Sequence, residues 1–304
     1  MGIKLKDILN NFNHLNECVC IAKQFGNDMI LGKNRDRNYN PTLKAVRDMT
    51  GYGVEILYVI DNDTDWSEGL NNHGIGLVNS ALFVKRDEKE VQKKKTARRS
   101  KDGVRIREVL GKKSLSDAVD CAVNFHGGIK GHTLIGDGKR IVSIENTSRL
   151  SPIVKIKDLT KEPLVRTNHG LEHPEAGYQR GNDKLSSELR LVNALNTLHD
   201  TDDYKKIMPA FYNHRQDKGP KYDLVRAQNK LWTSSQLVMN LNQKELILYL
   251  IPDAVEFIGV ENKLPNGYTP SIKFTIRKYK SAPDGKHDNY VTTSKRKKKN
   301  ALRK

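Results

Sequence analysis

Residues 18–36 decide how the chain is interpreted, and they read Cys-Val-Cys-Ile-Ala-Lys-Gln-Phe-Gly-Asn-Asp-Met-Ile-Leu-Gly-Lys-Asn-Arg-Asp. The alternating apolar residues at its start predict a strand, Gly26-Asn27-Asp28 predicts a tight turn, and the apolar residues 29–31 predict a returning strand. Folding this hairpin brings Asp36 back beside Cys18. A thiol held next to a carboxylate and further polar groups is a candidate nucleophile.

The composition predicts a globular protein of one large domain or two small ones. The chain has 304 residues and a mass of 34.5 kDa, with 37% hydrophobic residues and a mean hydropathy of −0.67. Its longest apolar runs, such as Leu246–Ile251, are far too short to span a bilayer. Three cysteines do not make a disulfide framework, and the first 30 residues lack an apolar signal segment. We therefore expect a cytoplasmic location.

The net charge of +17 is concentrated in two segments. Residues 85–113 carry 13 Lys/Arg against 5 Asp/Glu, and residues 294–304 carry 7 Lys/Arg and no acid, so together they hold 15 of the 17 charges. We predict a basic surface loop over 85–102 and a disordered basic tail over 281–304. Weak, nonspecific binding to nucleic acid or another polyanion and a merely solvated loop and tail both fit this pattern. The lack of interleaved aromatic residues argues against sequence-specific reading.

The remaining pattern predicts an α+β fold of antiparallel sheets covered by helices. Helices are expected over 104–110, 114–124 and 185–198, the last with Leu189, Leu191, Val192, Leu195 and Leu198 on or near one face. Glu68–Gly74 is expected to be a turn. Strands are expected over 54–60, 75–84, 131–136, 140–145, 233–239 and 245–251.

Several segments that follow the hairpin form an ordered set. The hairpin supplies Cys18 and Gly32-Lys33-Asn34-Arg35-Asp36, and later segments are Asn71–Ile75 with Asn79, Asp137–Glu145, Thr167-Asn168-His169, Ser186–Arg190 and Trp232–Ser235. In this order they resemble the N-terminal-nucleophile (Ntn) hydrolases of the choloylglycine hydrolase and penicillin acyltransferase group, which includes acid-ceramidase-like amidases. The resemblance covers roughly residues 18–255.

The resemblance implies a four-layer αββα domain over residues 18–280 that hydrolyses linear, non-peptide amides or transfers their acyl group. Its substrate would be a small amide or acyl compound, without cofactor or metal. Residues 1–17 would be a leader, and cleavage of the Glu17–Cys18 bond would give Cys18 a free α-amine as general base. Asp36 would then orient the ammonium form, and Asn79 and Asn168 would stabilise the tetrahedral oxyanion.

Five further residues are expected to support the site: Lys33, Arg35, Thr167, His169 and Arg226. Lys33 stands where the family has an arginine, and the two side chains are not equivalent at a site that binds planar groups. Arg35 lies two positions further along an extended strand and so points the same way. Family members often associate, so the resemblance leaves self-association open, although the sequence reveals no interface.

Other interpretations of these residues stay open. Cys18 also fits a structural residue of a buried strand, and the leader also fits a segment that stays attached. A Cys-His thiol hydrolase using His169 or His73 would not need the α-amine. The spacing of the nine histidines matches no common metal-binding pattern. A catalytically silent scaffold that binds a polyanion through its basic segments is the second functional hypothesis.

Overall fold

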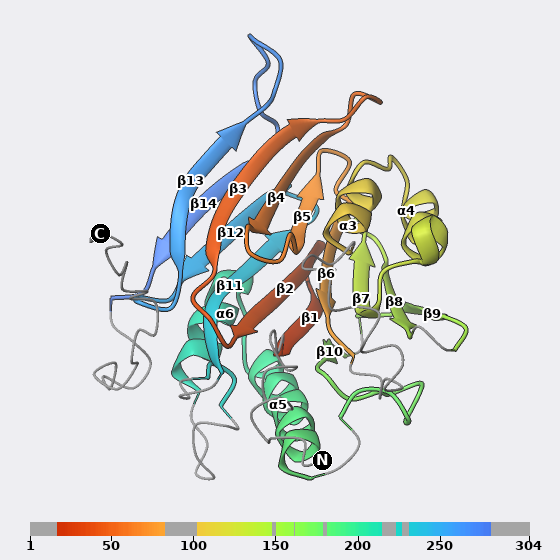
Figure 1. The fold of residues 1–304 in the computed structure, drawn as a ribbon, viewed down its shortest axis with the longest axis vertical. Coiled ribbons are helices and arrows are strands. Elements are labelled where there is room, and N and C mark those ends of the chain that lie inside the picture. Colours follow the sequence, from red (N-terminus) through yellow and green to blue (C-terminus); the bar gives the residue numbers. More distant parts are fainter. Residues whose placement is uncertain are drawn as a thin grey trace, which may run out of the picture.

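The computed structural model describes residues 17–82, 102–147, 150–160, 162–178, 181–214, 223–226 and 231–280. The predicted tail over 281–304, the basic loop apart from Asp102, and the leader apart from Glu17 lie outside these ranges. Glu17 is the first residue of a strand. Figure 1 shows the arrangement of the elements.

One sheet contains the hairpin on which the prediction rested. Within the described residues it has six strands in the order β10-β1-β2-β11-β12-β14. The strands are β1 (Glu17–Phe25), β2 (Asp28–Arg37), β10 (Leu164–Arg166), β11 (Trp232–Asn240), β12 (Glu245–Leu250) and β14 (Lys273–Lys278). The turn at Gly26, which has a φ of 56°, joins β1 to β2, as predicted. The central place of β2, between β1 and β11, buries both of its faces.

The second sheet has eight described strands in the order β13-β3-β4-β5-β6-β7-β8-β9. They are β3 (Thr42–Met49), β4 (Glu55–Asp61), β5 (Ser67–Asn71), β6 (Gly76–Ser80), β7 (Gly131–Gly136), β8 (Ile141–Asn146), β9 (Ile153–Lys157) and β13 (Glu256–Asn262). From β3 to β9 every neighbouring pair is antiparallel, whereas β13 joins β3 in parallel.

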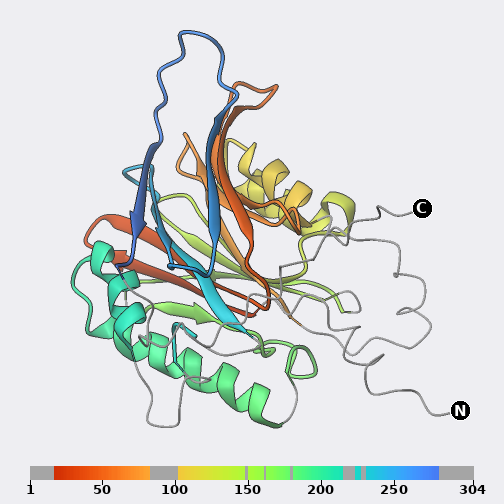
Figure 2. The ribbon, with the colours of Figure 1, turned by 60° about the vertical axis from the view of Figure 1, so that its left-hand side comes forward.

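Helices cover the outer face of each sheet and complete four layers (Figure 2). They are α3 (Asp102–Leu110), α4 (Leu115–Asn124), α5 (Gly181–His199) and α6 (Tyr204–Asn213), with a 3-10 turn η1 (Phe125–Gly127) after α4. One apolar core fills the space between the two sheets, a second lies under α5 and α6, and a third lies under α3 and α4. The predicted αββα layering is therefore confirmed.

Most of the predicted elements are confirmed, and three details are wrong. Ser114 caps α4 by accepting a hydrogen bond from the Asp117 backbone amide, which confirms the helix predicted over 114–124. Residues 68–71 are in strand β5, because Gly69 lies against β4 where a side chain would clash: a Cβ there would be 2.1 Å from Leu57 O. Strand β6 ends at Ser80 rather than at 84, and Val192 is 49% exposed rather than on the buried face of α5. No described helix is both long and apolar enough to cross a membrane.

Candidate active site

Cys18 lies at the open end of the β1–β2 hairpin, where the strand register pairs it with Arg35 and pairs Glu17 with Asp36. Side chains alternate between the two faces of a strand. Cys20 and Ala22 belong to the core between the sheets, whereas Val19 and Ile21 belong to the core under α5 and α6. Cys18 and Arg35 therefore face the second sheet, and Glu17 and Asp36 face helix α5.

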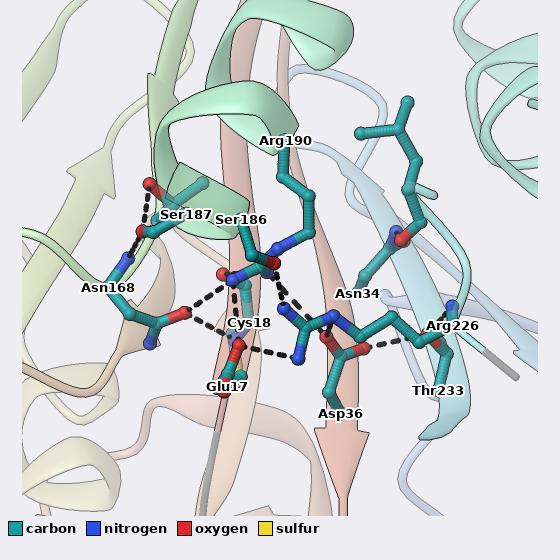
Figure 3. A network of polar contacts seen from close by, with 12 residues as sticks. Glu17, Cys18, Asn34, Asp36, Asn168, Ser186, Ser187, Arg190, Arg226 and Thr233 are labelled. Atoms are coloured by element: carbon teal, nitrogen blue, oxygen red, sulfur yellow. Dashed lines mark hydrogen bonds and ion pairs between the residues drawn. The ribbon is translucent and has the colours of Figure 1, made fainter. Parts of the chain in front are cut away.

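The helix side of the hairpin holds two carboxylates and two guanidinium groups (Figure 3). Arg190 Nη2 is 2.9 Å from Glu17 Oε2, and Arg190 Nη1 is 3.6 Å from Asp36 Oδ2. Arg226 Nη1 is 2.5 Å from Glu17 Oε2, and Arg226 Nε is 3.7 Å from Asp36 Oδ2. Each of the four residues is at least 96% buried. Because they carry two positive and two negative charges, the four-residue group is electrically balanced.

Within the described part of the chain, no hydrogen bond joins the Asp36 carboxylate to Cys18. Its Oδ1 accepts a hydrogen bond of 2.7 Å from Thr233 Oγ1, and its Oδ2 has no hydrogen-bond donor within the described part of the chain. Burial raises the pKa of Asp36 above its ordinary value, although Arg226 and Arg190 act in the opposite direction. Asp36 is linked to Cys18 through Arg190, whose Nη1 lies near Asp36 Oδ2 and donates to the Cys18 carbonyl.

The backbone nitrogen of Cys18 donates to Asn168 Oδ1 at 3.1 Å. Arg190 Nη2 donates to the same oxygen at 3.2 Å, and Arg190 Nη1 donates to the Cys18 carbonyl at 3.4 Å (Figure 3). A second hydrogen bond fixes the orientation of the Asn168 side chain, because its Nδ2 donates to Ala81 O at 2.9 Å. Asn168 thus lies directly beside the atom that cleavage would convert into an α-amine.

Ser187 connects the Thr167-Asn168-His169 segment to helix α5. Its Oγ accepts a hydrogen bond of 2.9 Å from the backbone N–H of Asn168. The same oxygen lies 3.0 Å from Thr167 Oγ1 and 2.9 Å from His169 Nδ1. Thr167 and His169 are therefore part of the scaffold that positions Asn168. Among the described residues no hydrogen bond joins His169 to the Cys18 thiol, so the structure gives no support to a Cys-His pair.

The sheet side of Cys18 is lined by a buried cluster of charges. Lys33 and Arg35 both form ion pairs with Glu68 of β5. Arg37 Nε lies 3.3 Å from Asp61 Oδ2, and Arg37 Nη1 lies 3.9 Å from Cys18 Sγ. Among the described residues, this cluster sets three cations against two carboxylates, so a Cys18 thiolate would balance it.

The burial of these cations changes their acid–base properties. Desolvation lowers the pKa of Lys33 to about 8 and that of Arg35 to about 10. Cys20 lies on the same face as Cys18, and burial raises the pKa of its thiol. This separates the two neighbouring cysteines: the neutral Cys20 packs in the core, and Cys18 lies beside Arg37.

The structure does not bring Asn79, the other predicted oxyanion donor, to the side of Cys18. Leu77 of β6 packs in the core under α3 and α4, so Asn79, two residues on, faces the same way, away from β1. Its Nδ2 donates to Lys130 O at 3.1 Å and to Thr133 Oγ1 at 2.7 Å, which uses both of its N–H groups. Its neighbour Ser80 faces the sheet interior instead, and donates to Thr167 O at 2.6 Å.

His73 lies far along the hairpin from Cys18. The adjacent Gly74 is packed against Leu241, whose amide bonds to Met29 O at the turn end of the hairpin. Cys121 packs in the core under α3 and α4, as predicted. Within the described ranges, no group of three or more His, Cys, Asp and Glu side chains could hold a metal ion.

Four residues of the site were not predicted from the sequence: Arg37, Asp61, Glu68 and Tyr178, whose OH donates a hydrogen bond to Glu17 Oε1. Arg190 was part of a quoted motif but was given no role. Arg37 could have been recognised from its place two positions after Arg35 on an extended strand. No local pattern indicates Glu68 and Asp61, because they come from other strands and reach the site only through the packing of the two sheets.

The solved structure of the Caenorhabditis elegans N-acylethanolamine-hydrolyzing acid amidase ortholog is similar to this chain. The TM-score is 0.52 with 16% sequence identity, over 78% of this chain and 95% of the other. This chain has the Ntn-hydrolase fold. A penicillin V acylase from Agrobacterium tumefaciens aligns over 84% of this chain and 99% of its own, with 9% identity and a TM-score of 0.39. No protein-family model and no curated protein sequence matches the chain.

The segments that carried the resemblance are distributed over both sheets of this Ntn-hydrolase fold. Residues 137–145 form the turn and second strand of the β7–β8 hairpin, and Glu145 accepts hydrogen bonds from the amides of Leu171, Glu172 and His173. Those bonds fix the loop that follows Asn168. The segment from Trp232 enters β11, whose Thr233 holds Asp36. The segments that contain Glu145, Asn168 and Thr233 thus support the open end of the hairpin, whereas Asn71–Ile75 lies toward its turn end.

Proposed function

We propose that the chain hydrolyses a linear, non-peptide amide, or transfers its acyl group, through the Cys18 thiol after cleavage of the Glu17–Cys18 bond. The observation that carries this proposal is the hydrogen bond from the Cys18 backbone nitrogen to Asn168 Oδ1. It prepares a partner for the α-amine before that amine exists. The Ntn-hydrolase fold and the buried charges on both sides of Cys18 support the same conclusion.

The first step is self-cleavage. The Cys18 sulfur attacks the Glu17 carbonyl carbon and the C–N bond breaks, so that the acyl group of Glu17 passes to sulfur. The proton that leaves the thiol is taken up by the Cys18 nitrogen, which becomes an amine. Water then hydrolyses the thioester and frees the thiol. No α-amine is present to take the thiol proton at this stage, and the buried positive charges of Lys33, Arg35 and Arg37 lie on the side of the hairpin that carries the thiol.

The second reaction repeats this chemistry on an external amide. The α-amine, with an ordinary pKa of about 7.7–8, takes the thiol proton and later delivers it to the leaving amine. Asn168 Oδ1 accepts a hydrogen bond from this nitrogen. Asp36 acts through Arg190, which contacts both Cys18 O and Asn168 Oδ1, so Asp36 is a positioning residue. Asn168 is thus assigned to the α-amine rather than to the oxyanion, because its Oδ1 accepts from the Cys18 nitrogen and its Nδ2 donates to Ala81 O. The acyl group leaves Cys18 to water or to an acceptor amine.

A thiol-directed acyl probe tests this function on the full-length chain. Peptide mapping should find the probe on Cys18, and the label should disappear in Cys18→Ala. Cys20→Ala is the matched control, because Cys20 lies on the same face of the same strand and is fully buried, and it should keep the label. Labelling of Cys20 or Cys121 with an unreacted Cys18 would refute Cys18 as the nucleophile.

A further inference from the structure

The side chain of Glu17 occupies a site built for a carboxylate. Its Oε2 lies 2.9 Å from Arg190 Nη2 and 2.5 Å from Arg226 Nη1, and its Oε1 accepts a hydrogen bond of 2.5 Å from Tyr178 OH. Glu17 is only 4% exposed, and both arginines are more than 97% buried. Figure 3 shows Arg190 reaching Glu17 from helix α5 and Arg226 reaching it from the side of Thr233. Hydrogen-bonded ion pairs, such as those of Glu17 with Arg190 and Arg226, are among the strongest polar contacts in proteins.

Removal of Glu17 would unbalance the charges of this site. The two guanidinium groups would then face the single carboxylate of Asp36, which leaves one uncompensated positive charge in a buried place. Leaving a buried charge without its partner is strongly unfavourable. After cleavage and release of the segment that precedes Cys18, the site therefore favours the binding of another anion.

The chemistry of self-cleavage indicates where that anion would come from. When the Cys18 sulfur attacks the Glu17 carbonyl, the product is a thioester between the Glu17 acyl group and Cys18. An external amide passes through the same type of thioester, with its own acyl group in place of Glu17. The Glu17 side chain therefore marks a place that a substituent of the substrate's acyl group can reach.

We propose that Arg190, Arg226 and Tyr178 form an acyl-carboxylate subsite, and that the substrates are amides of a glutaryl-like acyl group. In Glu17 three carbon atoms separate the scissile carbonyl from the carboxylate, as in a glutaryl group. The inference rests on the proposed function, because the subsite becomes available only after cleavage. It assigns Tyr178 a specificity role that the proposed function alone does not require.

The test compares two chromogenic substrates. The protein is produced as the full-length chain and allowed to process itself, and intact mass verifies the processing. The substrates are N-glutaryl-p-nitroanilide and its neutral isostere, in which a primary amide replaces the distal carboxylate. We expect kcat/KM for the glutaryl compound to be at least about 100-fold higher, because the neutral isostere leaves one of the two buried positive charges uncompensated. A second measurement does not need turnover: glutarate should slow the alkylation of Cys18 in the processed protein, whereas glutaramide should not.

Three variants sharpen the test. Tyr178→Phe removes one donor to the carboxylate and should reduce the glutaryl preference about tenfold or more. Arg140→Gln, on an exposed hairpin turn, is the matched control and should keep the full preference. Glu17→Gln should slow processing, but its processed product should show the wild-type preference, because residue 17 is no longer part of the enzyme.

The outcomes separate the two proposals. A processed, active enzyme that hydrolyses both substrates equally, or whose preference Tyr178→Phe leaves unchanged, would overturn the subsite and leave the nucleophile in place. A different preference in processed Glu17→Gln would also overturn it. If the wild-type chain is never cleaved, the proposed function fails, and the subsite fails with it.

Discussion

Glu17 and Asp36 lie directly opposite each other in the β1–β2 ladder, and their carboxylates share the same two guanidinium groups, those of Arg190 and Arg226. The residue before the candidate nucleophile is therefore an integral part of the charge network that surrounds it. Cleavage after Glu17 would divide this network into a part that leaves and a part that stays. The stability of the uncleaved chain and its processing are consequently coupled.

Asp36→Asn should destabilise the fold and block processing. The substitution leaves Arg190 and Arg226 facing one carboxylate, at an expected cost of about 3–5 kcal/mol in the free energy of unfolding. Urea denaturation of the full chain and its intact mass provide the two measurements. Asp28→Asn, at the turn of the same hairpin, is the control, with an expected change below about 0.5 kcal/mol. An Asp36→Asn protein that unfolds at the wild-type urea concentration would contradict the role of this network.

Lys33 variants should separate charge from shape in the cluster on the sheet side. Lys33→Arg keeps three cations against two carboxylates and should leave processing intact. Lys33→Met removes one of the three positive charges on the Cys18 side of the hairpin, and alkylation of Cys18 at pH 7 should slow about tenfold. The rate of iodoacetamide modification, followed by peptide mapping, measures this. Equal rates in wild type and Lys33→Met would show that the buried cations do not activate Cys18.

Ser187→Ala should slow processing by releasing Asn168. The change removes the acceptor of the Asn168 amide hydrogen bond and should reduce stability by about 1–3 kcal/mol. Ser114→Ala removes the N-cap of α4, far from the site, with a loss of about 1 kcal/mol. Comparing the time courses of processing distinguishes a positioning effect from general destabilisation. Equal slowing in both variants would leave Ser187 with a structural role only.

Stability should fall as the pH drops from 6.5 toward 4, in part because of His132. Its ring is fully buried, and desolvation lowers its pKa to about 4 in spite of the nearby Glu145. Between these pH values the unfolded chain binds a proton that the folded chain does not, so each step toward acid favours unfolding. His132→Gln should show a flatter dependence of the unfolding free energy on pH, whereas the exposed His126→Asn should not. An unchanged slope in His132→Gln would contradict this.

The parts of the fold that depend on neighbouring residues could be predicted from the sequence. Alternation around Cys18 and the Gly26 turn predicted the hairpin and its register, because both signals depend on neighbouring residues. The same reasoning failed at Glu68, where a glycine next to a charged residue suggested a turn. In the structure Gly69 permits close contact with β4, and Glu68 forms ion pairs with Lys33 and Arg35 of β2. Neither contact involves a neighbour in the sequence, so no local pattern indicates it.

The candidate site could be predicted only where it lies on the hairpin or in a recognisable segment. Cys18, Asp36 and Asn168 come together, but Asn79 does not. Which face of β6 is turned toward α3 and α4 depends on the packing of the whole sheet, and the sequence around Asn79 does not indicate it. Residues 256–278 were not predicted to form strands. There β13 and β14 join separate sheets in parallel with β3 and β12, and pairing of that kind leaves no local turn signal.

The mature N-terminus of the full-length chain tests the central claim most directly. N-terminal sequencing and intact mass of the purified wild-type protein should show Cys18 as the first residue of the large fragment, whereas Cys18→Ala should keep the bond between residues 17 and 18. A wild-type chain that remains uncleaved between Glu17 and Cys18, under conditions in which it is folded, would contradict the account.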